Sequence, residues 1–211
     1  PLQFKMFSDE AQKKAAANLA EMVKKNDYCI GTGFPGTPYI LFALADNGHA
    51  DTAFQMLLNT KCPSWLYEVK SGATTIWERW DGLDENGVCP IGDDGTDTMI
   101  SYNHYASGAV GAFLYQRIAG IEATRPGYKE FQIKPLVGGG LTGARGSVIT
   151  PYGEIISDWK VEGENFTIDI QIPVGCTCTL TMPNGEEKTC DSGKYHFLRK
   201  LRVTTFARRH P

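Results

Sequence analysis

Apolar residues recur at intervals of three and four through the first half of the chain. In the segment 11–25, Ala15, Leu19, Met22 and Val23 fall on one side of a helical wheel. This spacing is typical of an amphipathic helix with one buried face. The same reasoning predicts further helices over 39–45, over 51–58 and over 105–120.

From about residue 121 the period of the pattern changes to two. Apolar and polar residues alternate, with Gly, Pro and Asn turn signals between the runs, over 131–134, 155–161, 166–172 and 176–182. Short strands at this spacing are typical of a β-sandwich. Because helices come first and strands follow, the pattern predicts two consecutive domains, over 1–121 and 122–211. The basic tail over 198–211 departs from the pattern, and we expect a peripheral strand followed by a frayed end.

Composition and charge exclude several classes of protein. The chain has 211 residues, 42% of them hydrophobic and 21% charged, which is ordinary for a globular protein. A net charge of −3 gives no support for nucleic-acid binding, and no apolar run approaches the roughly 20 residues that a membrane helix needs. The chain begins with Pro1 and has no signal-peptide layout, so we expect it to start inside a longer protein, and its localisation stays undetermined.

The six cysteines do not have the spacing of a metal site. They are scattered along the chain, at positions 29, 62, 89, 176, 178 and 190. We expect free, buried thiols. No cofactor and no metal are predicted.

The strongest candidates for catalytic residues lie in a loop-rich stretch over 60–103, within the string GATTIWERWD at 72–81. It places one carboxylate, Glu78, between the indoles of Trp77 and Trp80. Aromatic faces suit the C–H side of a sugar ring, and charged groups suit its hydroxyls. A carboxylate beside indoles is also a candidate acid or base. The alternative is a tryptophan pair in the core with a solvated glutamate.

Other rare strings accompany this motif in a fixed order. They are GTGFPGTPYI at 31–40, CPSWLY at 62–67, SYNHYASG at 101–108, PGYK at 126–129 and TPYG at 150–153. In this order and at these spacings, the set resembles the C-terminal part of bacterial α-L-rhamnosidases, the inverting glycoside hydrolases of family 78. The resemblance runs from about Gly31 to about Phe197.

The resemblance implies both a fold and an activity. The fold is the last helices of an (α/α)6 barrel followed by an antiparallel β-sandwich, and the activity is inverting hydrolysis of terminal non-reducing α-L-rhamnosyl groups. It implies that Glu78 is the general base that activates water and that His104 contacts the sugar. Trp77, Trp80 and Trp65 are candidates for the pocket wall. For His104, a core or helix-capping role is the alternative.

Inverting hydrolysis needs a second carboxyl as general acid. Nothing before residue 31 resembles the acidic segment that carries it in the family. Asp9 and Glu10 fit the first turn of a helix, and Glu85 and the aspartates of 93–97 lie in a Gly-rich loop that we expect to be solvated. We therefore expect a fragment that lacks its acid and is inactive alone.

The expected partners are a rhamnose-containing glycoside or polysaccharide and the missing N-terminal part of the same polypeptide, or else a second copy of the chain. Uncovered helix faces of an incomplete barrel would drive that association. Two other functions stay open. One is a non-catalytic carbohydrate-binding or structural module, and the other is a different α/α-barrel enzyme that degrades polysaccharides.

Overall fold

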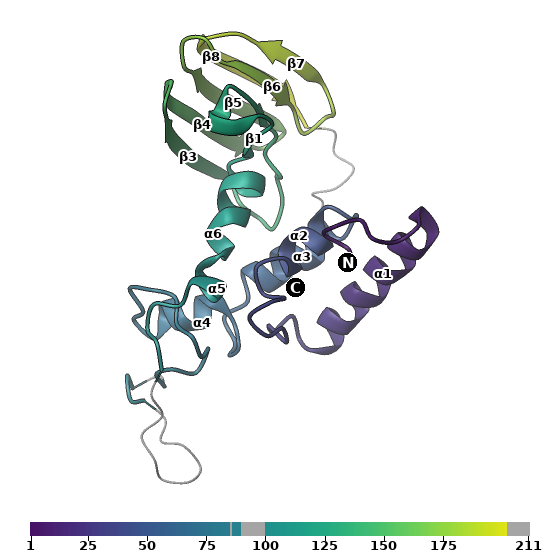
Figure 1. The fold of residues 1–211 in the computed structure, drawn as a ribbon, viewed down its shortest axis with the longest axis vertical. Coiled ribbons are helices and arrows are strands. Elements are labelled where there is room, and N and C mark those ends of the chain that lie inside the picture. The colour runs from purple at the N-terminus through teal and green to yellow at the C-terminus, as the bar shows by residue number, and fades with distance from the viewer. Residues whose placement is uncertain (85, 90–99, 202–211) are drawn as a thin grey trace. The chain divides into compact units, whose positions relative to one another are not determined.

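The computed structural model describes residues 1–84, 86–89 and 100–201, which form two compact units (Figure 1). The first unit ends at Gly111 and the second begins at Ala112, earlier in the chain than the predicted boundary at 121–122. The expectations for Glu85, for the aspartates of 93–97 and for the end of the basic tail lie outside the described residues.

The first unit is helical. Its elements are α1 (Asp9–Lys25), α2 (Ile40–Ala45), α3 (Ala50–Leu57), α4 (Trp65–Lys70) and α5 (Tyr105–Gly108). Helices α1, α2 and α3 pack against one another (Figure 1). Helix α4 lies in the stretch predicted to be loop-rich, and its first turn is stabilised because the Ser64 side chain accepts a hydrogen bond from the Tyr67 N–H at 3.1 Å.

Helix α1 confirms the predicted helix but buries a different face. Asp9 and Glu10 lie in its first turn, as predicted, where negative charge suits the helix dipole. The buried residues are Ala16, Ala20 and Val23, whereas Met22 is 66% exposed. Positions 16, 20 and 23 are spaced four and three apart and face α2 and α3, and Met22 points about 100° away from Val23 around the helix.

The predicted helix over 105–120 is interrupted. It consists of α5, α6 (Val110–Phe113) and a π-helical turn, η1 (Leu114–Ile118). Gly108 and Gly111 weaken the helical ladder, since glycine in a helix costs about 1 kcal/mol relative to alanine. The Trp65 indole also donates to the Ser107 carbonyl at 2.9 Å, so that oxygen is drawn toward a side chain.

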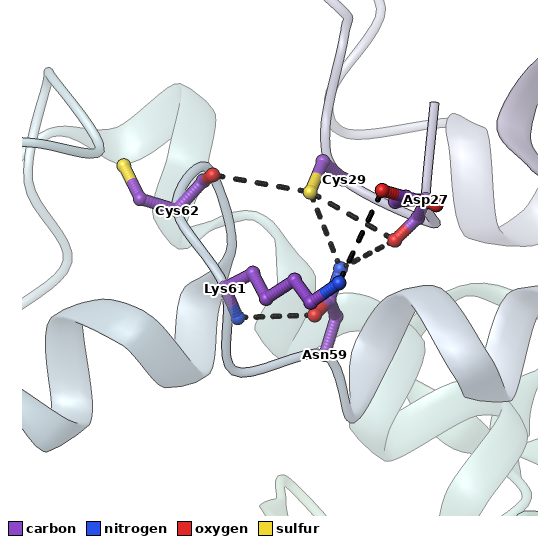
Figure 2. Close-up of polar contacts among 5 residues, drawn as sticks. All are labelled: Asp27, Cys29, Asn59, Lys61 and Cys62. Atoms are coloured by element: carbon purple, nitrogen blue, oxygen red, sulfur yellow. Dashed lines mark hydrogen bonds and ion pairs between the residues drawn. The ribbon is translucent and has the colours of Figure 1, made fainter. Parts of the chain in front are cut away.

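A polar cluster joins the loop before residue 31 to the loop before α4 (Figure 2). The Asn59 amide donates to Cys29 Sγ at 3.4 Å, and Cys29 Sγ lies 3.9 Å from the Cys62 carbonyl oxygen. The Ile30 N–H donates to the Pro63 carbonyl at 2.9 Å. Figure 2 shows the Cys62 sulfur turned away from Cys29. This junction holds the GTGFPGTPYI segment beside the start of α4.

The cysteines only partly follow the prediction of buried thiols. Cys62 is exposed and Cys89 is half-buried. The other four are buried, namely Cys29, Cys176, Cys178 and Cys190. Burial raises the pKa of Cys178 to about 12, so this thiol stays protonated at neutral pH.

The second unit contains two four-stranded sheets. One sheet has the order β1-β2-β6-β7, from β1 (Ile121–Ala123), β2 (Glu130–Ile133), β6 (Thr177–Thr181) and β7 (Glu187–Cys190). The other has the order β3-β4-β5-β8, from β3 (Gly143–Thr150), β4 (Gly153–Glu162), β5 (Asn165–Ile172) and β8 (Gly193–Lys200). All pairs are antiparallel except β2 and β6, which run parallel. A 3₁₀ turn, η2 (Pro126–Tyr128), connects β1 to β2.

The alternating pattern of β5 places one set of side chains in the core. These are Phe166, Ile168, Ile170 and Ile172. On β4 the fully buried Trp159 stacks on Phe166, and its indole donates to the Ile118 carbonyl at 2.8 Å. The fold class is therefore confirmed: a helical part followed by a β-sandwich. Among the described helices, none has both the length and the apolar character needed to cross a membrane.

Candidate active site

Two segments far apart in the sequence carry the two principal candidate residues, and hydrogen bonds join them. The Glu78 N–H donates to the Ser101 carbonyl at 2.8 Å. Further along, the His104 N–H donates to the Ile76 carbonyl at 2.8 Å. These backbone hydrogen bonds join the two segments in an antiparallel arrangement. Glu78 and His104 are therefore held on one hydrogen-bonded piece of backbone. We call the paired segments 76–78 and 101–104 the site frame.

The carboxylate of Glu78 is anchored to the same frame. Its Oε2 accepts a hydrogen bond from the Ser101 N–H at 2.9 Å, and the residue is half-buried. One carboxylate oxygen is thus fixed while part of the side chain reaches solvent. A fixed, partly exposed carboxylate is suited to take a proton from a water molecule.

Arg79 is turned to a neighbouring aspartate. Its Nε and one terminal nitrogen donate to the two carboxylate oxygens of Asp81 at 3.1 and 3.0 Å. The hydrogen bond from Arg79 holds the pKa of Asp81 below its usual range. This pair fixes the loop immediately after Glu78.

The three candidate tryptophans differ in exposure. Trp77 is 2% exposed and packs edge-on against Tyr102, with ring centroids 5.7 Å apart. Trp65 is 3% exposed and packs edge-on against Trp80, with centroids 5.6 Å apart. Trp80 itself is half-buried. Trp65 and Trp77 therefore lie beneath the site as packing residues, and Trp80 retains surface that can face a ligand.

The His104 ring is held by aromatic contacts. It stacks on Phe34 at 4.4 Å between centroids and on Tyr105 at 5.5 Å. His104 occupies the N-cap position of α5, but its side chain makes no capping hydrogen bond. Its Nδ1 is buried, and the described residues offer it no hydrogen-bond partner. Because this nitrogen is closed to solvent, the other ring nitrogen, Nε2, is the candidate for a hydrogen bond to a sugar hydroxyl.

Phe34 is a site residue that the sequence reasoning missed. It lies in a tight loop in which the Thr37 hydroxyl lies 2.9 Å from that of Thr32 and 3.1 Å from the Gly33 carbonyl, to which it donates. A Cβ on Gly36 would come within 3.2 Å of Thr32. The loop leaves Phe34 47% exposed against His104. The sequence signal that could have identified Phe34 is its place as the aromatic residue of the GTGFPG string.

Glu68 was also missed. It is 0% exposed on α4, and its Oε2 accepts a hydrogen bond from the Trp77 N–H at 3.0 Å. Burial raises the pKa of Glu68 to about 7. Glu68 follows Trp65 by three positions, so both side chains lie on the buried face of α4. That spacing was the only sequence signal.

No metal centre is built from the described residues, since nowhere among them do three or more His, Cys, Asp or Glu side chains gather in a suitable group. Glu68 is not suited to act as the general acid that inverting hydrolysis needs, because it has no exposed surface from which to reach a leaving group. The site contains one accessible carboxylate in the frame, a histidine and a partly exposed indole.

The fold is a helical part followed by a β-sandwich, and comparison with known families places this arrangement in a class of carbohydrate hydrolases. Residues 1–118 match the bacterial α-L-rhamnosidase six-hairpin glycosidase domain, and residues 120–197 match the bacterial α-L-rhamnosidase C-terminal domain. The chain belongs to the bacterial α-L-rhamnosidase family, whose members are glycoside hydrolases.

Individual relatives agree with this assignment. An α-L-rhamnosidase of Formosa agariphila is 36% identical over 197 residues, covering 92% of this chain and 21% of the relative. A crystal structure of the native Aspergillus terreus α-L-rhamnosidase matches with a TM-score of 0.87 at 36% identity, covering 94% of this chain and 23% of that one. The Streptomyces avermitilis enzyme complexed with L-rhamnose matches with a TM-score of 0.86 at 32% identity, covering 94% and 21%. The chain thus spans about a fifth of the length of these relatives.

Proposed function

We propose that the complete protein containing this chain hydrolyses terminal non-reducing α-L-rhamnosyl groups of glycosides or polysaccharides, with inversion at the anomeric carbon. The observation that carries the proposal is the half-buried Glu78 carboxylate, whose Oε2 is held by the Ser101 N–H in the frame that also carries His104. The match of the fold to a relative solved with L-rhamnose supports the choice of sugar.

In this proposal Glu78 is the general base. It takes a proton from a water molecule on the face of the sugar opposite the leaving group, and the water oxygen forms the new bond to the anomeric carbon as the glycosidic bond breaks. The Ser101 N–H keeps the carboxylate oriented during this step. The proton that the leaving oxygen needs comes from a carboxylic acid in the remainder of the polypeptide.

His104 and Trp80 bind the sugar. The imidazole of His104 hydrogen-bonds a hydroxyl, and the stacked Phe34 ring limits the directions in which it can point. The partly exposed face of Trp80 covers the C–H side of the ring. The buried Trp65 and Trp77 support these residues from below.

The helical unit of this chain is completed by the missing N-terminal part of the polypeptide. Beside α1 lies an open groove of about 490 Å³ whose apolar lining includes Leu19, Met22, Ile40 and Met56. Covering such a surface is favourable, because each Å² of apolar area removed from water contributes about 25 cal/mol. In the isolated chain this surface drives self-association, which sedimentation velocity over a range of concentrations measures.

The test of the proposed function is Glu78→Gln in the full-length enzyme, with an aryl α-L-rhamnoside as substrate. We expect kcat to fall on the order of 10²–10⁴-fold, as loss of a general base does. Glu21→Gln, on the exposed surface of α1, is the matched control and keeps wild-type kinetics. Proton NMR of the first product gives the β anomer. Unchanged kinetics in a folded Glu78→Gln enzyme remove Glu78 from catalysis.

A further inference from the structure

Glu68 lies where a charged side chain is unusual. It is completely buried on a helix of six residues, beneath the segment that contains Glu78. Buried carboxyls are nearly always paired with a cation or fully hydrogen-bonded. Glu68 has a single partner, the Trp77 N–H, and its Oε1 is buried with no hydrogen-bond partner among the described residues. A carboxyl in these surroundings costs stability, so we looked for a role in the site.

The partner of Glu68 is the middle residue of one side of the site frame. The backbone groups of Ile76 and Glu78 are directed at the 101–104 segment, through His104 and Ser101. The Trp77 N–H instead points toward α4, where Glu68 Oε2 accepts it at 3.0 Å. The segment is therefore held on both sides, by the 101–104 backbone and by the side chain of Glu68.

The protonation state of the Glu68 carboxyl follows from its surroundings. Burial with one hydrogen bond and no cation favours the neutral acid of Glu68 and raises its pKa to about 7, so the neutral form predominates below that pH. Among the described residues, no arginine, lysine or histidine forms an ion pair with Glu68. The neutral acid still offers its carbonyl oxygen to the Trp77 N–H. A glutamine side chain offers the same acceptor with nearly the same shape.

We propose that Glu68 is a positioning residue for Glu78: by accepting a hydrogen bond from the Trp77 N–H, it fixes the backbone immediately before the base and so the direction of the Glu78 carboxylate. The inference rests on the proposed role of Glu78 as general base. Glu68 touches neither the sugar nor the water, and it acts only through the backbone between Trp77 and Glu78.

The experiment uses the full-length enzyme with an aryl α-L-rhamnoside and compares Glu68→Gln with Glu68→Leu. Leucine removes the acceptor and leaves the buried Trp77 N–H unpaired. We expect Glu68→Leu to lower kcat by about 10- to 100-fold, because a displacement of about 1 Å in a catalytic group has this effect. KM stays within about twofold, since sugar-binding contacts are kept. Glu68→Gln retains kcat within about threefold, because its acceptor is kept.

Two further variants separate positioning from general damage. Ser64→Ala removes the cap of the same helix but not the contact to Trp77, so it lowers the melting temperature and keeps kcat. In a Glu78→Gln background, Glu68→Leu causes no further loss of kcat, because both changes act on one step.

Three results would overturn the proposal. They are wild-type kcat in Glu68→Leu, an equal loss of kcat in Glu68→Gln and Glu68→Leu, and additive losses in the double variant. The single variant Glu78→Gln tests the proposed function separately. If Glu78→Gln loses activity while Glu68→Leu does not, the base stands and the positioning role fails. If Glu78→Gln keeps full activity, the proposed base itself is wrong.

Discussion

The buried carboxyl of Glu68 makes the stability of this chain depend on pH near neutrality. Its ordinary pKa is 4.5, and burial raises it to about 7 in the folded chain. The folded state thus binds the proton more tightly than the unfolded state. The resulting stabilisation is complete below about pH 4.5 and is lost as the pH rises through about 7.

The size of this stabilisation follows from the shift in the pKa of Glu68. Each pKa unit corresponds to about 1.4 kcal/mol, so the interval from 4.5 to about 7 sets an upper limit of about 3–4 kcal/mol. Part of the effect falls below pH 5, so we expect a loss of about 2–3 kcal/mol between about pH 5 and about pH 8. Glu68→Gln cannot ionise, so it lacks this loss.

The assay is urea unfolding of this chain at about pH 5 and about pH 8, followed by tryptophan fluorescence. Trp65, Trp77 and Trp80 are three of the four tryptophans and lie in the helical unit, so the signal reports mainly on that unit. Glu21→Gln is the control, because its exposed carboxylate pairs with Lys24 and it should keep the wild-type pH dependence. An identical loss of stability in wild type and Glu68→Gln would refute the raised pKa of Glu68.

Three other outcomes follow from the structure. Phe34→Leu in the full-length enzyme removes the ring stacked on His104 and raises KM for an aryl rhamnoside by about 3- to 10-fold, at little cost to kcat, as steady-state kinetics will report. Trp159→Phe deletes the buried indole hydrogen bond and lowers the unfolding free energy of the sandwich unit by about 1–3 kcal/mol, measured by chemical denaturation. Arg199 lowers the pKa of Glu186 to about 2, so this pair stabilises the folded chain above about pH 4.5, and the stabilisation is lost as the pH falls toward 2. In thermal unfolding, the melting temperature of Glu186→Gln should therefore fall less than that of wild type over this pH range.

Local patterning was sufficient to predict the class of each half of the chain. The helical period of α1 and the alternation in β5 are properties of neighbouring residues, and both elements formed where they were predicted. The direction of pairing was not predictable in this way. Strands β2 and β6 are separated by more than 40 residues and run parallel, because their pairing is set by how the connecting segments cross the sandwich.

The sequence by itself was sufficient to select Glu78 and His104 as candidates, because each lies in a short string that resembles the family. It placed Trp65 and Trp77 beside them without revealing that both are buried. Exposure depends on what packs over a side chain, and that is settled only when distant segments meet.

Only the tertiary structure revealed the contacts of Glu68 and Phe34. Glu68 reaches the backbone at Trp77 across nine positions, and Phe34 stacks on His104 from a loop 70 positions earlier. No local spacing encodes these contacts. The candidate base could thus be found in the sequence, whereas the contacts that Glu68 and Phe34 make around it arise from packing between different segments of the fold.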